Sequence, residues 1–172
     1  ALDFSVDGQR LFTGSSDGYL RSFAATGSRE LLNRTRAHDA DLTSLCTTTD
    51  GQYVATASQN DKAIKLWKAD TLGIEDTLVG HTDEVMCVVA TGKDNPMLVS
   101  ASGDHTIKIW DLKTYQEIRT LKSQKGFIGS VVAVSDDQRN IISGDYDRIV
   151  RLWCFDTGKL ISCFEGHTDD IR

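Results

Sequence analysis

The sequence predicts an all-β chain made of about four small, four-stranded antiparallel sheets. The chain has 172 residues and contains a repeat with a period of 43. One marker of the repeat is a tryptophan, which is found at Trp67, Trp110 and Trp153. A second marker is an aspartate six residues before each tryptophan, at Asp61, Asp104 and Asp147. Between these markers, short runs of strand-forming residues alternate with turn signals, as antiparallel strands require.

The repeat that begins at Gly80 gives the clearest view of the strands. We expect strands at Val85–Ala90, Met97–Ser102, Ile107–Asp111 and Glu117–Leu121. Turn-prone segments such as Gly103-Asp104 separate them, and connections this short join antiparallel neighbours. No apolar pattern of helical period persists beyond one turn, so the repeat is built from strands alone.

The first two strands of each repeat are apolar at nearly every position. Both faces of each sheet therefore need to be covered. Stacking the sheets face to face provides that cover, and each sheet then contacts only its neighbours in the chain. Because sheets twist, a stack of this kind turns into a ring.

The repeat markers divide the chain into five parts. Residues 1–36 form an incomplete repeat, residues 37–79, 80–122 and 123–165 form three repeats, and residues 166–172 begin another. In the first repeat Phe23 takes the place of the tryptophan. The chain stops where the first strand of a repeat would continue, and two uncovered sheet faces would remain in water. We therefore expect further repeats before and after this sequence, rather than a closed ring of four sheets.

Composition excludes several classes of function. The net charge is −6, whereas broad binding to nucleic acid or to anionic membranes requires a basic surface. No apolar run is long enough to span a membrane, and the start has no signal-peptide pattern. The cysteines show no metal-ligand spacing, and we expect buried thiols at Cys46, Cys87, Cys154 and Cys163. We expect no cofactor and no metal, and an intracellular location, cytoplasmic or nuclear.

The repeat resembles that of the WD40 family. The segments that carry the resemblance are Gly80-His81…Asp104…Trp110-Asp111, Ala37-His38…Asp61…Trp67 and Asp147…Trp153. The resemblance covers essentially the whole chain, and it implies a β-propeller in which each four-stranded sheet is one blade. Rings of this kind have four to eight blades, and the family usually closes with about seven. We therefore expect a partial propeller of about four blades, which is a segment of a larger ring.

The resemblance also implies an internal polar network in each blade. It links a histidine before the first strand, a hydroxyl on the second strand, an aspartate in the following turn and the tryptophan on the third strand. The residues expected in such networks are His38, Thr56, Asp61 and Trp67, then His81, Ser100, Asp104 and Trp110, then Ser143, Asp147 and Trp153. Two repeats depart from the pattern, because Gln124 replaces the third histidine and Phe23 replaces the first tryptophan.

The function that the resemblance implies is a non-enzymatic scaffold for protein–protein interaction. The connections between repeats and the turns between second and third strands emerge at one end of the blades, which we call the top face. The family usually binds its partners there. The positions expected to bind a partner protein or peptide are Asp41, Thr43, Asn60, Glu84, Met86, Gly103, Phe127, Tyr146 and Asp170. Apolar anchors dominate the energy of interfaces, and the carboxylates among these positions would suit a basic peptide.

Three other classes of function compete with the scaffold. The Trp110-Asp111-Leu112-Lys113 segment is similar to a docking motif of ubiquitin-ligase substrate receptors, with lysine in place of arginine. A hydrolase triad would occur once in a site, whereas the histidine, hydroxyl and aspartate recur with the repeat. Basic residues lie two before each tryptophan, at Lys65, Lys108 and Arg151, and we expect them to extend over neighbouring apolar surface rather than bind nucleic acid.

Overall fold

Every regular element in the computed structural model is a β-strand. The model describes residues 1–92, 94–123, 128–135 and 137–171, and within them the strands form four four-stranded sheets. The first blade contains β1 (Leu2–Phe4), β2 (Arg10–Gly14), β3 (Tyr19–Ala24) and β4 (Leu31–Arg36). The second contains β5 (Leu42–Thr47), β6 (Tyr53–Ser58), β7 (Ala63–Lys68) and β8 (Ile74–Val79).

The remaining two blades have the same plan. The third contains β9 (Val85–Thr91), β10 (Met97–Ser102), β11 (Thr106–Asp111) and β12 (Gln116–Lys122). The fourth contains β13 (Ile128–Val134), β14 (Asn140–Asp145), β15 (Ile149–Cys154) and β16 (Leu160–Glu165). In every blade the strands pair antiparallel in chain order. The four strands expected from residue 85 onward are confirmed, with their ends extended by at most one residue.

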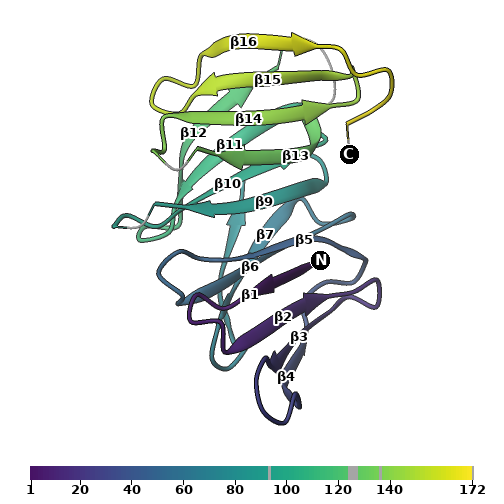
Figure 1. Ribbon diagram of the computed structural model, residues 1–172, viewed down its shortest axis with the longest axis vertical. Coiled ribbons are helices and arrows are strands. Elements are labelled where there is room, and N and C mark those ends of the chain that lie inside the picture. Colours follow the sequence, from purple (N-terminus) through teal and green to yellow (C-terminus); the bar gives the residue numbers. More distant parts are fainter. Residues whose placement is uncertain (93, 124–127, 136, 172) are drawn as a thin grey trace.

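The blades stack in chain order. The first strand of each blade contacts the first strand of the next, so β1, β5, β9 and β13 lie side by side. The first and fourth blades lie at opposite ends of the long axis of the molecule (Figure 1). The prediction of a partial propeller of four blades is thus confirmed. The stack is open, and it does not close into a ring of four.

The hydrophobic cores lie between the blades. The core between the first two blades contains Phe12, Leu20, Val54 and Trp67. The core between the second and third contains Ala55, Ile64, Leu78, Leu98 and Trp110. The core between the third and fourth contains Val99, Ile107, Leu121, Ile141 and Trp153. Each tryptophan therefore packs against the preceding blade, and each large apolar side chain buried here contributes about 1.5–3 kcal/mol.

The two ends of the stack leave equivalent positions uncovered. On the first blade Leu2 is 72% exposed, whereas Leu45, at the same place in the second blade, is 7% exposed. Phe4 on the same face is 58% exposed. On the fourth blade Ile142 is 42% exposed, whereas the equivalent Val99 of the third blade is fully buried. The repeat thus places apolar side chains for contact with a neighbour even where the structure contains none.

The expectation that all four cysteines are buried is met only in part. Cys46 is buried as expected, but Cys163 is exposed, because it lies on β16, the outer strand of the last blade. Cys87 and Cys154 are half-buried, and the described cysteines form no disulfide. In the part of the chain that the structure describes, no helix is long and apolar enough to cross a membrane.

Replacing Ile107 with alanine should destabilise the chain by about 2–5 kcal/mol, because this side chain is fully buried between the third and fourth blades. The same replacement at Ile142 should cost less than about 1 kcal/mol, because that side chain is 42% exposed. Chemical denaturation of both variants measures the two free energies of unfolding. Equal losses at the two positions would contradict the arrangement of covered and uncovered faces.

Candidate functional site

The third blade contains a closed polar network around His81. His81 follows β8, Ser100 lies on β10, Asp104 is in the next turn and Trp110 lies on β11. Nδ1 of His81 is 2.9 Å from Oδ2 of Asp104, and its Nε2 is 2.7 Å from Oγ of Ser100. Nε1 of Trp110 donates to the same Oγ at 2.9 Å. The network joins the connection from the second blade to two strands and a turn of the third.

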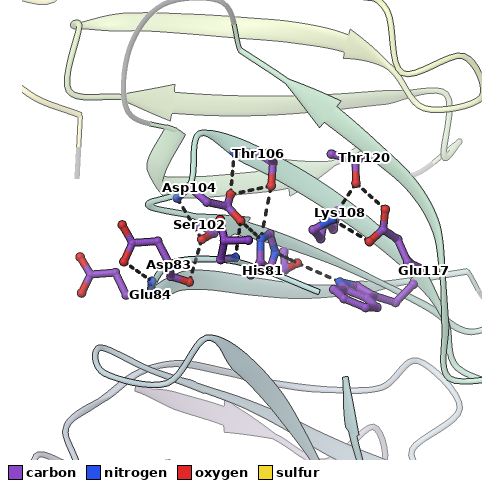
Figure 2. Close-up of polar contacts among 12 residues, drawn as sticks. His81, Asp83, Glu84, Ser102, Asp104, Thr106, Lys108, Glu117 and Thr120 are labelled. Carbon is purple, nitrogen blue, oxygen red and sulfur yellow. Dashed lines mark hydrogen bonds and ion pairs between the residues drawn. The ribbon is translucent and has the colours of Figure 1, made fainter. Parts of the chain in front are cut away.

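The direction of each hydrogen bond follows from the donors available. The Trp110 N–H can only donate, so the Ser100 hydroxyl accepts it and directs its own proton to Nε2 of His81. Nδ1–H of His81 then donates to Asp104, whose other oxygen accepts the Thr106 hydroxyl at 2.6 Å (Figure 2). Burial acts to raise the pKa of Asp104, but hydrogen bonds from His81, Thr106 and the Thr82 amide outweigh it and hold that pKa below its usual range.

The second blade repeats the network with a threonine. Nδ1 of His38 is 2.5 Å from Oδ2 of Asp61, and its Nε2 is 2.8 Å from Oγ1 of Thr56. Nε1 of Trp67 donates to Oγ1 of Thr56 at 2.8 Å. Burial lowers the pKa of His38 despite the nearby carboxylate of Asp61, which favours the neutral imidazole that this arrangement of donors requires. Both networks therefore have the geometry that the resemblance implied.

The fourth blade keeps half of the network and replaces the rest. Nε1 of Trp153 donates to Oγ of Ser143 at 2.9 Å, while Gln124 lies outside the described residues. A buried ion pair joins Arg151 to Asp145, which stands where the third blade has Ser102. Asp147, the expected network member, is 3.7 Å from Nη2 of Arg151. An arginine with two carboxylates thus occupies this end of the fourth blade.

The first blade has an exposed ion pair in place of the network. Phe23 fills part of the tryptophan volume and has no proton to donate. Asp17, at the place of Asp61, binds the guanidinium of Arg21 at 2.5 Å. The hydrogen bond from Arg21, aided by one from the Tyr19 amide, lowers the pKa of Asp17 to about 2.

The basic residues on the third strands make polar contacts that the sequence did not predict. Lys65 donates to the carbonyl of Ala37 at 2.9 Å and lies 3.4 Å from Asp61. Lys108 donates to Glu117 at 2.6 Å. These cations do not simply extend over apolar surface, because the preceding and following segments of the repeat place carbonyl and carboxylate oxygens beside them.

Backbone hydrogen bonds connect the loops that carry four of the predicted partner-binding positions. The Asp41 carbonyl accepts the Gln59 amide at 3.1 Å, beside the exposed Asn60, and the Glu84 carbonyl accepts the Gly103 amide at 2.9 Å. Each bond ties the connection that enters a blade to the turn after the second strand. The side chain of Glu84 points away from the His81 network (Figure 2). The backbone of the top face is thus held in place, while these carboxylates remain outside the networks.

The other predicted positions differ in how much of their side chain is exposed for contact with a partner. Asp170 is exposed, and Met86 and Tyr146 are half-buried. Thr43 is half-buried and donates to the Val85 carbonyl of the next blade at 3.0 Å, so it also joins two blades. Gly103 is buried and contributes only backbone. Phe127 lies outside the described residues.

The loops of the top face are strongly acidic. Their acidic residues are Asp17, Asp39, Asp41, Asp61, Asp83, Glu84, Asp104, Asp147, Asp169 and Asp170. Their basic residues within the described part of the chain are Lys62 and Arg148, and Arg21, Lys65 and Arg151 on the third strands pair with Asp17, Asp61 and Asp147. The sequence predicted only Asp41, Glu84 and Asp170 among the carboxylates that would suit a basic partner, because the charge of a whole face depends on loops from different blades. A surface of one charge attracts partners of the opposite charge.

The networks do not have the properties of an active site. Ser100 and Thr56 are fully buried, so their hydroxyls have no access to a substrate. Each hydroxyl is also occupied by a tryptophan N–H. Among the described residues, no group of three or more histidine, cysteine, aspartate or glutamate side chains is arranged to hold a metal ion.

Comparison with known proteins gives one family. The family model described as "WD domain, G-beta repeat" matches residues 1–23, 29–68, 74–111 and 115–154. Over 86 residues, 49% of the chain, the sequence is 35% identical to a bromodomain and WD repeat-containing protein of Dictyostelium discoideum. Over 102 residues, 58% of the chain, it is 28% identical to cilia- and flagella-associated protein 52 of Sus scrofa. These matches cover only 4% and 16% of the two relatives, so they concern the repeat and not the whole proteins.

Replacing Ser100 with alanine should cost about 2–5 kcal/mol of unfolding free energy, because it leaves both Trp110 Nε1 and His81 Nε2 without a partner. The matched control is Ser143→Ala, which removes the partner of Trp153 alone and should cost about half as much. Chemical denaturation of the two variants tests this. If Ser143→Ala proves the more damaging, the third-blade network does not have the stabilising role described.

Proposed function

The chain belongs to the WD40 repeat family, and we propose that it is a non-enzymatic scaffold whose top face binds other proteins or peptides in a multiprotein complex. Membership of the family indicates a protein-interaction role in general. The propeller fold hosts many specific functions, so the particular role has to be argued from the site. The bromodomain in one relative's name and the cilia and flagella in the other's belong to those proteins, of which the matches cover only 4% and 16%.

The observation that carries the proposal is the acidic charge on a fixed top face. Hydrogen bonds between Asp41 and Gln59 and between Glu84 and Gly103 hold the loops before any partner arrives. A preorganised surface binds with less loss of conformational entropy. The half-buried Met86 adds an apolar contact beside Glu84. A partner segment with Lys or Arg side chains around an apolar residue fits this combination best.

Further blades of the same parent chain are part of the proposal. They would cover Leu2 and Phe4 at one end of the stack and Ile142 at the other, as the four blades cover one another. The contacts of Ile171 also support the proposal of a following blade. Its side chain packs on Gly144 as that of Leu42 packs on Gly14. Its amide donates to the Asp145 carbonyl at 3.3 Å, as the amide of Leu42 does to Ser15. We propose that the complete ring has about seven blades.

We do not propose the substrate-receptor role in ubiquitin ligation. The segment that suggested it has a local structural explanation, because Leu112 is buried and Oδ1 of Asp111 accepts the amides of Lys113 and Thr114. We retain the expectation that the partners are proteins rather than nucleic acid or membrane, because the top face is acidic. An intracellular location, cytoplasmic or nuclear, likewise remains our proposal.

The proposed function is tested by charge reversal on the top face. The protein is captured with its partners from cells, both unchanged and as the double variant Asp41→Lys, Glu84→Lys. We expect the double variant to lose at least 90% of a partner that binds the top face, because two attractive contacts become repulsive. Neither side chain takes part in the His38 or His81 network, so thermal stability should remain within a few degrees of the original.

The control is Asp156→Lys, which reverses one charge instead of two in an exposed turn at the other end of the fourth blade. This variant should retain all partners. If the control loses partners and the double variant keeps them, the top face is not the interaction surface and the proposed function is wrong.

A further inference from the structure

The end of the blades opposite the top face contains two cavities at equivalent places. This bottom face is formed by the turns that join the first strand to the second and the third strand to the fourth. A cavity of about 420 Å³ lies where the first blade meets the second, and one of about 410 Å³ lies where the second meets the third. Asp50 lines both cavities, so they are neighbours that share a wall.

The first cavity combines an apolar lining with carboxylates. Val6, Phe12 and Ala69 supply apolar surface, and Val6 is 64% exposed. Asp7, Asp50 and Asp70 also line the cavity. Its lining includes one cation, Arg10, whose Nη1 donates to the carbonyls of Ala69 and Asp70 at 2.9 and 2.8 Å. The guanidinium is therefore held against the wall by backbone oxygens.

The carboxylates of the first cavity have oxygens available for a ligand. Oδ1 of Asp7 accepts a hydroxyl and an amide of its own turn, and Oδ1 of Asp50 does the same. Within the described residues, Oδ2 of both and the carboxylate of Asp70 make no hydrogen bond or ion pair. The turns thus fix these side chains and leave their outer oxygens to face solvent.

The second cavity has the same plan with aromatic walls. Tyr53, Tyr115 and Leu112 supply its apolar surface, and Asp50 and Asp94 supply carboxylates. Its lining also includes one cation, Lys113, whose Nζ donates to the carbonyl of Asp94 at 3.5 Å. The Tyr115 hydroxyl donates to Glu75 at 3.0 Å and lies 3.3 Å from the Tyr53 hydroxyl, so the position of both rings is defined. Tyrosine faces attract cations as well as aliphatic groups.

We propose that the bottom face binds an extended basic segment of a partner protein, with one Lys or Arg side chain in each cavity. Such a side chain has an aliphatic stem that suits the walls around Val6 and Tyr53, and a cationic end that suits the carboxylates above them. An apolar segment would leave Asp7, Asp50 and Asp70 without a counter-charge, and an acidic one would be repelled. This surface is separate from the top face, so the scaffold has two faces for two different partners.

The test uses the 172-residue chain and a fluorescein-labelled tetralysine peptide, with binding followed by fluorescence anisotropy at low ionic strength. We expect Asp50→Asn to weaken binding about tenfold, because Asp50 contributes to both cavities. Asparagine keeps an oxygen that can accept the Thr48 hydroxyl and the Gln52 amide, so the turn should be preserved. Asp70→Asn provides a second variant that involves no hydrogen bond of a turn.

The matched control is Asp137→Asn. Asp137 accepts the Ser135 hydroxyl and the Arg139 amide in the equivalent turn of the fourth blade, but it lines neither cavity. It should change the affinity less than twofold. In a Glu84→Lys background, which weakens the basic-segment binding proposed for the top face, Asp50→Asn should still weaken binding about tenfold. If Asp137→Asn weakens binding as much as Asp50→Asn, the net charge of the chain alone explains the binding of the peptide. If only Glu84→Lys weakens it, the peptide binds the top face. Either result, or no measurable binding, overturns the proposal.

Discussion

A four-stranded sheet with two apolar faces is stable only when neighbours cover both, and the whole chain is arranged around this requirement. Trp67, Trp110 and Trp153 each lie on the face that meets the preceding blade, and the opposite faces carry Phe12, Ile64 and Ile107. Because each core belongs to two blades, no blade is an independent folding unit. The same requirement accounts for the exposed apolar side chains at the two ends of the stack.

The polar networks fix the connections through which the chain passes from one blade to the next. The connection that contains His81 leaves the outer strand of the second blade and enters the inner strand of the third. Bonds to Ser100 and Asp104 fix it at both ring nitrogens. The top face is formed by these connections, so the bonds that stabilise a blade also fix the surface proposed to bind partners.

Much of the fold could be predicted from the sequence, because a 43-residue period fixes the number of blades and a tryptophan marks the same strand in each. The two complete networks followed from the resemblance. The pair Asp145–Arg151 was missed, since nothing in one sequence shows that these charges face each other inside the fourth blade. The sequence does show that Asp145 stands where the third blade has Ser102, and this difference could have indicated a charge inside the fourth blade. The bottom cavities were missed because each is formed by turns from two blades.

The central claim is that blades stabilise one another through shared cores, and native-state hydrogen exchange tests it most directly. The middle blades are covered on both faces, so amides of β6, β7, β10 and β11 should exchange most slowly. Amides of β2 and β3 in the first blade, and of β14 and β15 in the fourth, should exchange faster because one face of each is uncovered. Slowest exchange in the first or fourth blade would contradict the claim.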